Sequence, residues 1–331
     1  MKKTIVGFDI GNSNLKVAVE KKKQISVYTV AIPENLVVEG VIKLPRLMVD
    51  FLKEVKKGYK IKSGPCGLIV SDSQVVCRSF SMPPMTEKQL KINLPFEFND
   101  YISDEPDKYV YDYAVQEITR DEEGKPKEMK LTGAVISKQA VEDYIEVFKN
   151  AGFQLQTLIP QEMALSNLMR KAIEAGKAEE GKEYCIINLG YDGTRVYILK
   201  GSQLQVIRTV PMGGVDLDKA IAANENVDTF MAATYKNTNY NNVLEREYCR
   251  DLFTRLTLEI MKVINFYYFN NRDSSLDNVF FVGGTSNIAE LCQNIADTTN
   301  LTRHSITELL TCELGEEEAA SGLLALGTML Q

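Results

Sequence analysis

The stretch Asp9-Ile10-Gly11-Asn12-Ser13-Asn14 decides how this 331-residue chain is expected to fold. Residues 3–10 are mainly apolar, and residues 14–20 alternate apolar with polar side chains, so each segment is predicted to form a β-strand. The glycine, asparagine and serine between them are turn-forming residues, which makes the pair a strand hairpin. Rossmann and P-loop sites instead place a helix directly after a glycine-rich turn, and neither glycine pattern occurs here. We therefore expect a phosphate-binding turn carried by a hairpin.

The second half of the chain repeats this plan. Residues 184–190 are apolar and residues 194–200 are strand-like, with the turn Tyr191-Asp192-Gly193 between them. Another turn, Gly283-Gly284, follows the apolar segment 278–282. A single glycine turn often does no more than close a tight loop. Three of them, each after a predicted buried strand, are typical of a site whose backbone N–H groups clamp a nucleotide. The repeat therefore predicts a duplicated, two-lobed nucleotide-binding protein.

The composition excludes several other classes of protein. Hydrophobic residues make up 44% of the chain and charged residues 25%, an ordinary balance for a globular protein with a large core. The net charge of -7 and the lack of a long basic tract argue against nucleic-acid binding. A single histidine, His304, excludes a multi-histidine zinc site. The six cysteines form no Cys-x-x-Cys pair, and Cys185 and Cys292 are predicted to be buried thiols.

The membrane is not expected to hold this chain directly. No apolar run reaches the roughly 18 residues that a membrane-spanning helix needs. The N-terminus lacks the apolar core of a signal peptide. We therefore expect a cytoplasmic protein.

The strand and helix patterns predict two lobes and one insert. Lobe I is expected to comprise residues 1–80 and 153–180, and an insert of helix, two strands and helix to occupy residues 81–152. Lobe II is expected to comprise residues 181–331, with a smaller subdomain at about residues 215–255. The last predicted helix is apolar and rich in alanine and glycine, so we expect it to return to lobe I.

Six segments of the chain carry a resemblance to a known family. They are residues 80–87 (FSMPPMTE), 131–138 (LTGAVISK), 151–153 (AGF), 210–216 (VPMGGVD), 259–267 (EIMKVINFY) and 281–288 (FVGGTSNI). With the order of the glycine turns, they resemble the actin, heat-shock chaperone and sugar-kinase superfamily, and within it the branch of FtsA and of PilM, the type IV pilus assembly protein. This resemblance implies an α/β, actin-like (ribonuclease H-like) fold of two duplicated lobes. Lobe I would be subdomain 1A, lobe II subdomains 2A and 2B, and the insert the 1C subdomain of FtsA and PilM.

The resemblance assigns nucleotide-binding roles to residues of all three turns. It implies that Asp9 orders Mg²⁺ through water, that Lys16 offsets phosphate charge, and that the β-phosphate is surrounded by Gly11, Asn12, Ser13 and Asn14. In lobe II the matching residues are Asn188, Gly190 and Thr194 for the phosphate loop, Gly213 and Gly214 for the glycine pair after it, and Gly283, Gly284 and Thr285 for the adenosine motif. Glu259 is expected to approach the ribose or adenine. The implied ligand is ATP or ADP with Mg²⁺.

One position departs from the family pattern. Asn188 stands where the second phosphate loop usually opens with an aspartate. An amide still forms hydrogen bonds, but it cannot act as a base for the attacking water. Gln161 and Glu162 fall where related ATPases position that water, although helix capping or surface exposure explains them equally well. We expect a weak ATPase at most.

The insert offers a surface for a partner. It contains six aromatic residues within a short span: Phe96, Phe98, Tyr101, Tyr109, Tyr111 and Tyr113. Such residues are good peptide anchors, but their alternation at 109, 111 and 113 equally fits one face of a strand that packs on its own helices. The resemblance implies that the partner is the N-terminal cytoplasmic tail of a PilN-like bitopic membrane protein. Such a partner would hold the chain at the inner face of the cell membrane.

Three other functions compete with this hypothesis. An FtsA-like or other actin-like filament former would self-associate, and an FtsA-like protein would add an amphipathic membrane helix after its last core helix, which we do not expect here. A small-molecule kinase would need a catalytic aspartate in a sugar-kinase motif, and none is visible. The cytoplasmic half of a type II secretion platform protein would continue into a transmembrane helix. A pilus assembly scaffold fits best.

Overall fold

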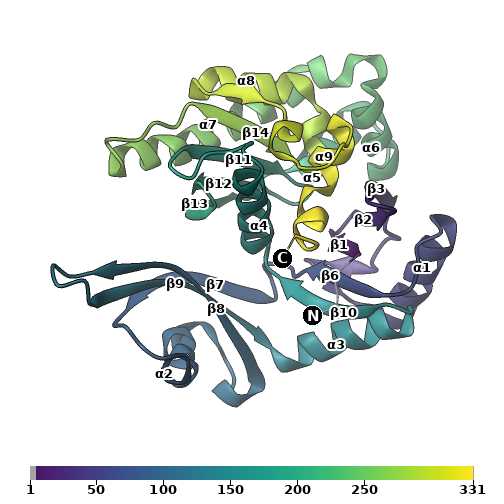
Figure 1. Ribbon diagram of the computed structural model, residues 1–331. Helices are drawn as coiled ribbons and strands as arrows, with labels where there is room; N and C mark the ends of the chain where they lie inside the picture. The colour runs from purple at the N-terminus through teal and green to yellow at the C-terminus, as the bar shows by residue number, and fades with distance from the viewer. Residues whose placement is uncertain (1–4, 331) are drawn as a thin grey trace. The chain divides into compact units, whose positions relative to one another are not determined.

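The computed structural model describes residues 5–330, which form two compact units. Unit 1 is drawn from residues 1–15 and 30–161, and unit 2 from residues 16–29 and 162–331. The elements of both are labelled along the ribbon in Figure 1. Residues 3 and 4 of the predicted strand 3–10 lie outside the described residues.

The division into units differs from the predicted lobes at two elements. The hairpin of β2 (Asn14–Lys21) and β3 (Gln24–Ala31), and the helix α4 (Gln161–Glu174), group with unit 2. Both contact the last helix, α9 (Glu316–Gly327). A Cβ added to Gly322 would lie 2.4 Å from Val27 Cγ1, and one added to Gly327 would lie 2.6 Å from the Ala164 carbonyl oxygen. The C-terminal helix thus packs tightly on two elements that the sequence pattern places in lobe I.

Two sheets of five strands share one connectivity. Their strand orders are β10-β6-β1-β2-β3 and β15-β14-β11-β12-β13. In each, the first strand in sequence is central, with an antiparallel hairpin or meander on one side and two later strands on the other. The remaining strands are β1 (Val6–Ile10), β6 (Pro65–Ile69), β10 (Gln154–Ile159), β11 (Glu183–Leu189), β12 (Thr194–Lys200), β13 (Gln203–Val210), β14 (Asn278–Val282) and β15 (Thr302–His304). The predicted internal duplication is confirmed.

The core of unit 1 joins its parallel strands to two helices. These helices are α1 (Pro45–Gly58) and α3 (Lys138–Asn150), which pack on each other, and α3 also packs on β10. The ring of Phe8 on β1 makes edge-to-face contacts at centroid distances of 5.0 Å with both Phe148 and Phe153. Such contacts add to the burial of apolar area. Two short strands, β4 (Val37–Val38) and β5 (Val41–Ile42), complete this part of the unit.

The insert is a three-stranded antiparallel sheet with short helices on one face. Its strands run in the order β7-β9-β8, with β7 at Val75–Met82, β8 at Tyr109–Arg120 and β9 at Pro126–Ser137. Its helices are α2 (Glu87–Asn93), η1 (Leu94–Tyr101) and η2 (Pro106–Lys108). The predicted range 81–152 begins near the end of β7, which pairs with β9 along its length, and includes α3, which packs on α1 and β10.

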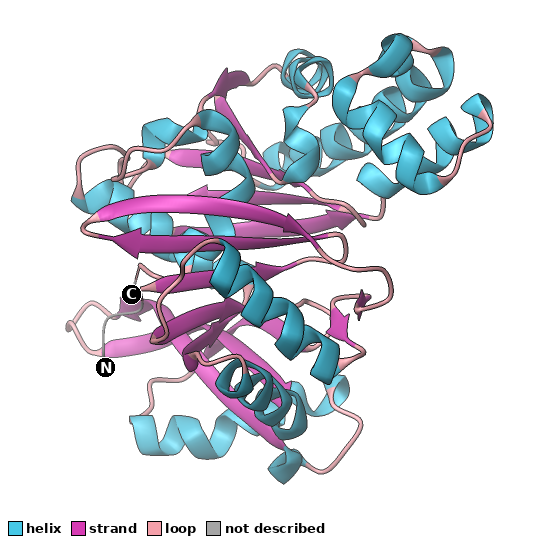
Figure 2. Cartoon of the chain, turned by 90° about the vertical axis from the view of Figure 1, so that its right-hand side faces the viewer, coloured by secondary structure: helices cyan, strands magenta, loops and turns pink. Residues whose placement is uncertain are grey.

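The sheet of unit 2 has the most deeply buried strands of the chain. Every residue of β11 and of β14 is buried. Figure 2 distinguishes the helices (cyan) from the strands (magenta). Besides α4, the helices of unit 2 are α5 (Gly214–Glu225), α6 (Thr229–Thr238), η3 (Tyr240–Glu245), α7 (Glu247–Asn270), η4 (Gly284–Asn287), α8 (Ala289–Thr299), η5 (Ile306–Leu309) and α9. Cys185 and Cys292 lie in this core as predicted, and burial raises the pKa of each thiol to about 12. Within residues 5–330, no helix is long and apolar enough to cross a membrane.

Candidate functional site

The central strand of each sheet ends in one buried polar residue. In unit 1, Asp9 of β1 pairs in register with Ile69 of the parallel strand β6. In unit 2, Asn188 of β11 pairs with Val282 of the parallel strand β14. Asp9 is 9% exposed and Asn188 is 8% exposed. Open α/β sheets bind ligands at the carboxyl ends of their strands, and both residues lie near that end of their strand.

The turn after β1 is held by its own side chains and backbone. The Gly11 N–H donates to the Asn14 carbonyl at 3.0 Å, which closes the hairpin turn. The Asn12 side-chain oxygen accepts from the Gly40 N–H at 2.7 Å. The Asn14 amide donates to Ser13 Oγ at 3.0 Å. The acceptor of Asn12 therefore positions a neighbouring loop, while the backbone of this half-buried turn keeps the compact shape that phosphate binding requires.

Two glycine turns of unit 2 pack directly against each other. The Gly214 N–H donates to the Gly190 carbonyl at 3.0 Å, and the Val215 N–H donates to the Tyr191 carbonyl at 2.9 Å. A Cβ added to Gly213 would lie 2.4 Å from the Tyr191 carbonyl oxygen, closer than any real side chain. Thr194 Oγ1, fully buried, donates to the Met212 carbonyl at 2.9 Å. These glycines are thus required by turn-on-turn packing, whatever else they bind.

The third glycine turn joins the same cluster. Gly283 has a φ of +93°, and a Cβ there would lie 2.4 Å from Asn188 Oδ1. Thr285 Oγ1 donates to the Gly190 carbonyl at 3.3 Å. Gly284 differs from the others because no atom lies within 4 Å of where its Cβ would be, and the residue is exposed. Gly284 therefore offers open backbone beside a rigid set of turns, the kind of surface on which a flat ring can lie.

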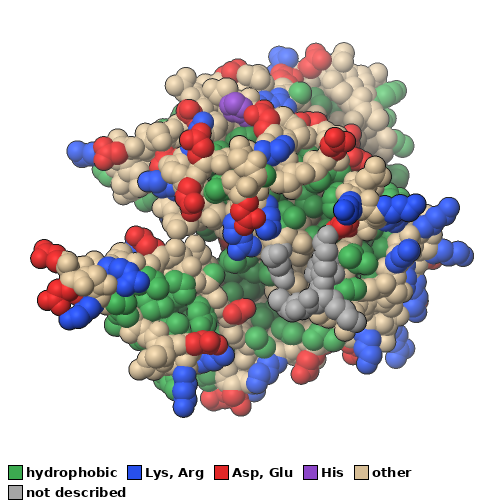
Figure 3. Space-filling model, viewed as in Figure 1, with side chains coloured by type: hydrophobic (Ala, Val, Ile, Leu, Met, Phe, Trp, Pro, Cys, Tyr) green, Lys and Arg blue, Asp and Glu red, His purple; other side chains and the backbone are tan. Residues whose placement is uncertain are grey.

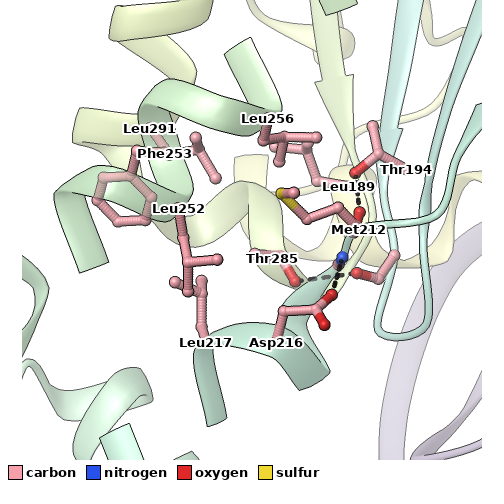
Figure 4. Close-up of a pocket in the computed structure, with 12 residues that line it drawn as sticks. Leu189, Thr194, Met212, Asp216, Leu217, Leu252, Phe253, Leu256, Thr285 and Leu291 are labelled. Atoms are coloured by element: carbon pink, nitrogen blue, oxygen red, sulfur yellow. Dashed lines mark hydrogen bonds between the residues drawn. The ribbon is translucent and has the colours of Figure 1, made fainter. Parts of the chain in front are cut away.

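A small, mainly apolar pocket lies behind these turns. Figure 4 shows that its turn-side groups are already engaged: Thr194 bonds Met212, Thr285 bonds Gly190, and Asp216 accepts from the Gly213 N–H at 2.9 Å. The rest of the lining is apolar and consists of Leu189, Leu217, Leu252, Phe253, Leu256 and Leu291. An apolar wall with satisfied polar groups does not suit a phosphate. The pocket belongs to the packing of α5, α7 and α8 on the turns.

The structure adds a buried ion pair that the sequence did not predict. Lys236 Nζ on α6 lies 2.7 Å from Asp218 Oδ1 on α5, and their side chains are 9% and 1% exposed. Lys236 Nζ also donates to the Gly214 carbonyl at 3.2 Å. Burial raises the pKa of the Tyr191 phenol, and the nearby Asp218 charge raises it further by a smaller amount. A lysine in a polar helical segment gives no sequence signal of burial, because the contact that buries it is tertiary.

Four of the other candidate residues lie outside the three glycine turns. Glu259 is exposed on α7 and forms an ion pair with Lys262 at 2.6 Å. Gln161 is buried at the start of α4, and Glu162 after it is half-buried. Lys16 is half-buried on β2. Within unit 2, the residues of the glycine turns are brought together.

The side chains available as metal ligands limit how an ion could bind beside Asp9. Among residues 5–330, no group of three or more His, Cys, Asp or Glu side chains is placed to hold a metal ion. A hard cation such as Mg²⁺ commonly keeps most of its water and takes phosphate oxygens from a nucleotide. The buried carboxylate of Asp9 fits the remaining role, which is to accept hydrogen bonds from that water.

The aromatic residues of the insert divide into core and surface. Phe98 is fully buried, and Tyr109, Tyr111 and Tyr113 pack against its cluster with Leu94 and Val135. The alternation at 109, 111 and 113 is therefore the inner face of β8. Phe96 stays 66% exposed, and Tyr101 is exposed beneath the Arg78 guanidinium at 4.3 Å from its ring centroid.

Apolar side chains remain on the outside of the insert. Figure 3 shows hydrophobic side chains gathered there, beside the charged tip of the β8–β9 hairpin. Val110, Val115 and Ile118 are exposed on β8, whereas Ile92 and Phe96 are exposed on the helices α2 and η1. We name the pair Ile92 and Phe96 the insert surface. Exposed apolar groups of this kind suit a protein partner.

Comparison with known proteins places this geometry in a family. The model of the family described as type IV pilus assembly protein PilM matches residues 7–329. The solved PilM-PilN type IV pilus biogenesis complex matches with 23% identity and a TM-score of 0.83, covering 100% of this chain and 98% of that chain. The ethanolamine utilization protein EutJ from Carboxydothermus hydrogenoformans matches with 13% identity and a TM-score of 0.59, covering 98% and 89%. No curated protein matches. The expected actin-like fold is confirmed.

Proposed function

This chain belongs to the type IV pilus assembly protein PilM family, and we propose that it serves such a machine as a nucleotide-binding scaffold. The observation that supports nucleotide binding is the duplicated arrangement at Asp9 and Asn188. Each central strand ends in a buried polar residue followed by a glycine turn. Turns of this kind present backbone N–H groups to phosphate oxygens. The ligand would be ATP or ADP, with the exposed backbone at Gly284 beside its nucleoside.

Hydrolysis should be slow or absent. Asn188 replaces the carboxylate that would accept a proton from the attacking water, and an amide has no such basicity. Its Oδ1 is also packed toward Gly283, at 2.4 Å from the position of an added Cβ. The bound nucleotide would then act as a structural ligand that stabilises the folded state, and not as a substrate for hydrolysis.

Asp9→Ala tests the nucleotide site. We expect the variant to bind Mg²⁺-ATP at least about tenfold more weakly in titration calorimetry, since it loses charge-assisted hydrogen bonds. Asp251→Ala, an equal change of charge at an exposed position of α7, should bind like the wild type. A wild-type chain that binds neither ATP nor ADP would contradict the proposal. Turnover of about 1 s⁻¹ or faster that Asp9→Ala abolishes would contradict slow hydrolysis.

We further propose that the insert surface docks the N-terminal cytoplasmic tail of a PilN-like membrane protein. Support comes from the family and from the exposed apolar residues at Ile92 and Phe96, which are 61% and 66% exposed. The apolar side chains of a short peptide contribute most of its affinity when they pack against such exposed apolar residues. The chain would then lie at the inner face of the membrane through its partner.

The double variant Ile92→Ser with Phe96→Ser tests this docking. Fluorescence anisotropy with a labelled tail peptide should show affinity at least about tenfold weaker, the scale of lost hot-spot residues. Phe230→Ser is the matched control, because Phe230 is 77% exposed on α6 of the other unit. Deleting residues 81–152 would be a poorer test, since it removes α3 from the core of unit 1. Equal peptide affinity in the double variant and the control would rule the insert surface out.

A further inference from the structure

The buried pair of Asp218 and Lys236 in unit 2 has no role in the proposed function. Both side chains are almost fully buried, and the ammonium nitrogen lies 2.7 Å from Asp218 Oδ1. The Tyr191 phenol also interacts with the Asp218 carboxylate, which helps to raise the pKa of that phenol. Two charges taken out of water are rarely retained for stability alone, because their desolvation offsets most of their attraction. The pair therefore calls for another role.

The position of the lysine indicates that role. Lys236 comes from α6 and Asp218 from α5, and the Lys236 ammonium also donates to the Gly214 carbonyl at 3.2 Å. Its nitrogen would lie only 3.3 Å from a Cβ at Gly214, and it lies 5.7 Å from the Tyr191 ring centroid. Thr285 Oγ1 would be 2.7 Å from the same Cβ. The ammonium group thus contacts the Gly213-Gly214 turn directly, and this turn also contacts Gly190 and Thr285.

We infer that Asp218 and Lys236 are positioning residues for the nucleotide site, which hold the Gly213-Gly214 turn against Gly190 in its ligand-binding arrangement. This inference rests on the proposed nucleotide binding and adds a residue-level cause for it. Because Asp218 neutralises Lys236, the pair adds no net charge for phosphate to meet. It acts through the shape of the turn, and the phosphate would bind the backbone N–H groups that this shape presents.

The test compares three alterations of the pair with one control. Asp218→Asn and Lys236→Met each leave one buried charge without its counter-ion, so each lowers stability and frees the turn. The double variant removes both charges, so it should regain stability while the turn remains unanchored. Glu183→Gln is the control, because Glu183 is a buried carboxylate of the same unit that is bonded to Tyr267, Ser274 and Ser275, away from the turns.

The thermal unfolding midpoint and the affinity for ADP are measured on the full chain. The affinity is measured at a temperature well below that midpoint. We expect both single variants and the double variant to bind ADP at least about tenfold more weakly than the wild type. Glu183→Gln should unfold at a lower temperature yet bind within about twofold of the wild type. Hydrogen exchange should show ADP protecting residues 190–194 and 213–216 in the wild type and in the control, and not in the pair variants.

The outcomes separate this inference from the proposed function. If the double variant regains both stability and affinity, the pair is merely structural and the inference is wrong. Single variants that fold and bind ADP like the wild type would overturn it as well. A wild-type chain that binds no ADP refutes the proposed function itself, and the inference falls with it.

Discussion

Replacing Gly283 by alanine is expected to destabilise unit 2 by about 3–4 kcal/mol, combining the cost of a positive φ with that of overpacking. The backbone φ of +93° is a conformation that L side chains rarely adopt. The new methyl group would also lie 2.4 Å from Asn188 Oδ1 and 2.5 Å from the Leu189 carbonyl oxygen. One of those atoms is main chain in a fully buried strand, so it cannot move aside. The midpoint of thermal unfolding should fall by about 10 °C.

Gly284→Ala is the matched control for this prediction. It makes the same chemical change one residue later, but its Cβ would meet no atom within 4 Å. An exposed glycine-to-alanine change at an ordinary φ alters stability by less than about 1 kcal/mol. Thermal unfolding followed by circular dichroism compares the two variants directly. Equal midpoints would show that Gly283 is not held in the tight contact described here.

The glycine turns could be predicted from sequence because their signals are local. Gly11, Gly190 and Gly283 each follow an apolar strand within one or two residues, and turn chemistry needs no distant partner. The start of α2 depends on an equally local signal, because Thr86 and Gln89 form a capping box within one helical turn. Duplication of the strand hairpin then predicted two lobes, and the family resemblance implied the actin-like fold class.

Features made by distant contacts could not be predicted in this way. The membership of β7 in the insert depends on its pairing with β9, whose register joins Val75 to Ile136. Lys236 meets Asp218 only because α5 and α6 pack side by side. Alternation at Tyr109, Tyr111 and Tyr113 shows that these residues share a face, but not that helices cover it.

Glu259 lies outside the buried face of its helix. The buried residues of α7 include Phe253, Leu256, Ile260 and Ile264, which recur at helical spacing. Position 259 falls outside that stripe, so its side chain is exposed. Its role at the ribose or adenine, which only the family resemblance implies, stays a prediction.

Glu183→Ala is expected to cost about 3–5 kcal/mol, the range for a buried carboxylate whose several donors are left unpaired. Glu183 Oε1 accepts from Tyr267 Oη at 2.7 Å. Its Oε2 accepts from Ser274 Oγ at 2.6 Å and from the Ser275 N–H at 3.0 Å. The carboxylate therefore fixes the segment between α7 and β14 to the start of β11. Its removal leaves the hydroxyl of Tyr267 without its hydrogen-bond acceptor, and Tyr267 is only 3% exposed.

The pH dependence of that loss gives the prediction a second, independent check. Burial and then the Glu183 hydrogen bond raise the pKa of Tyr267 above its ordinary value of 10.0. A group with a raised folded-state pKa contributes stability that is present at low pH and is lost as pH rises past its unfolded value. The wild type should therefore lose more stability above pH about 10 than Glu183→Ala, which lacks the Glu183 part of the shift. Urea unfolding at neutral and at alkaline pH measures the narrowing gap, with Glu259→Ala as the exposed control, expected within about 1 kcal/mol of the wild type. A gap between wild type and Glu183→Ala that stays constant or widens with pH would show that Glu183 does not hold the Tyr267 proton.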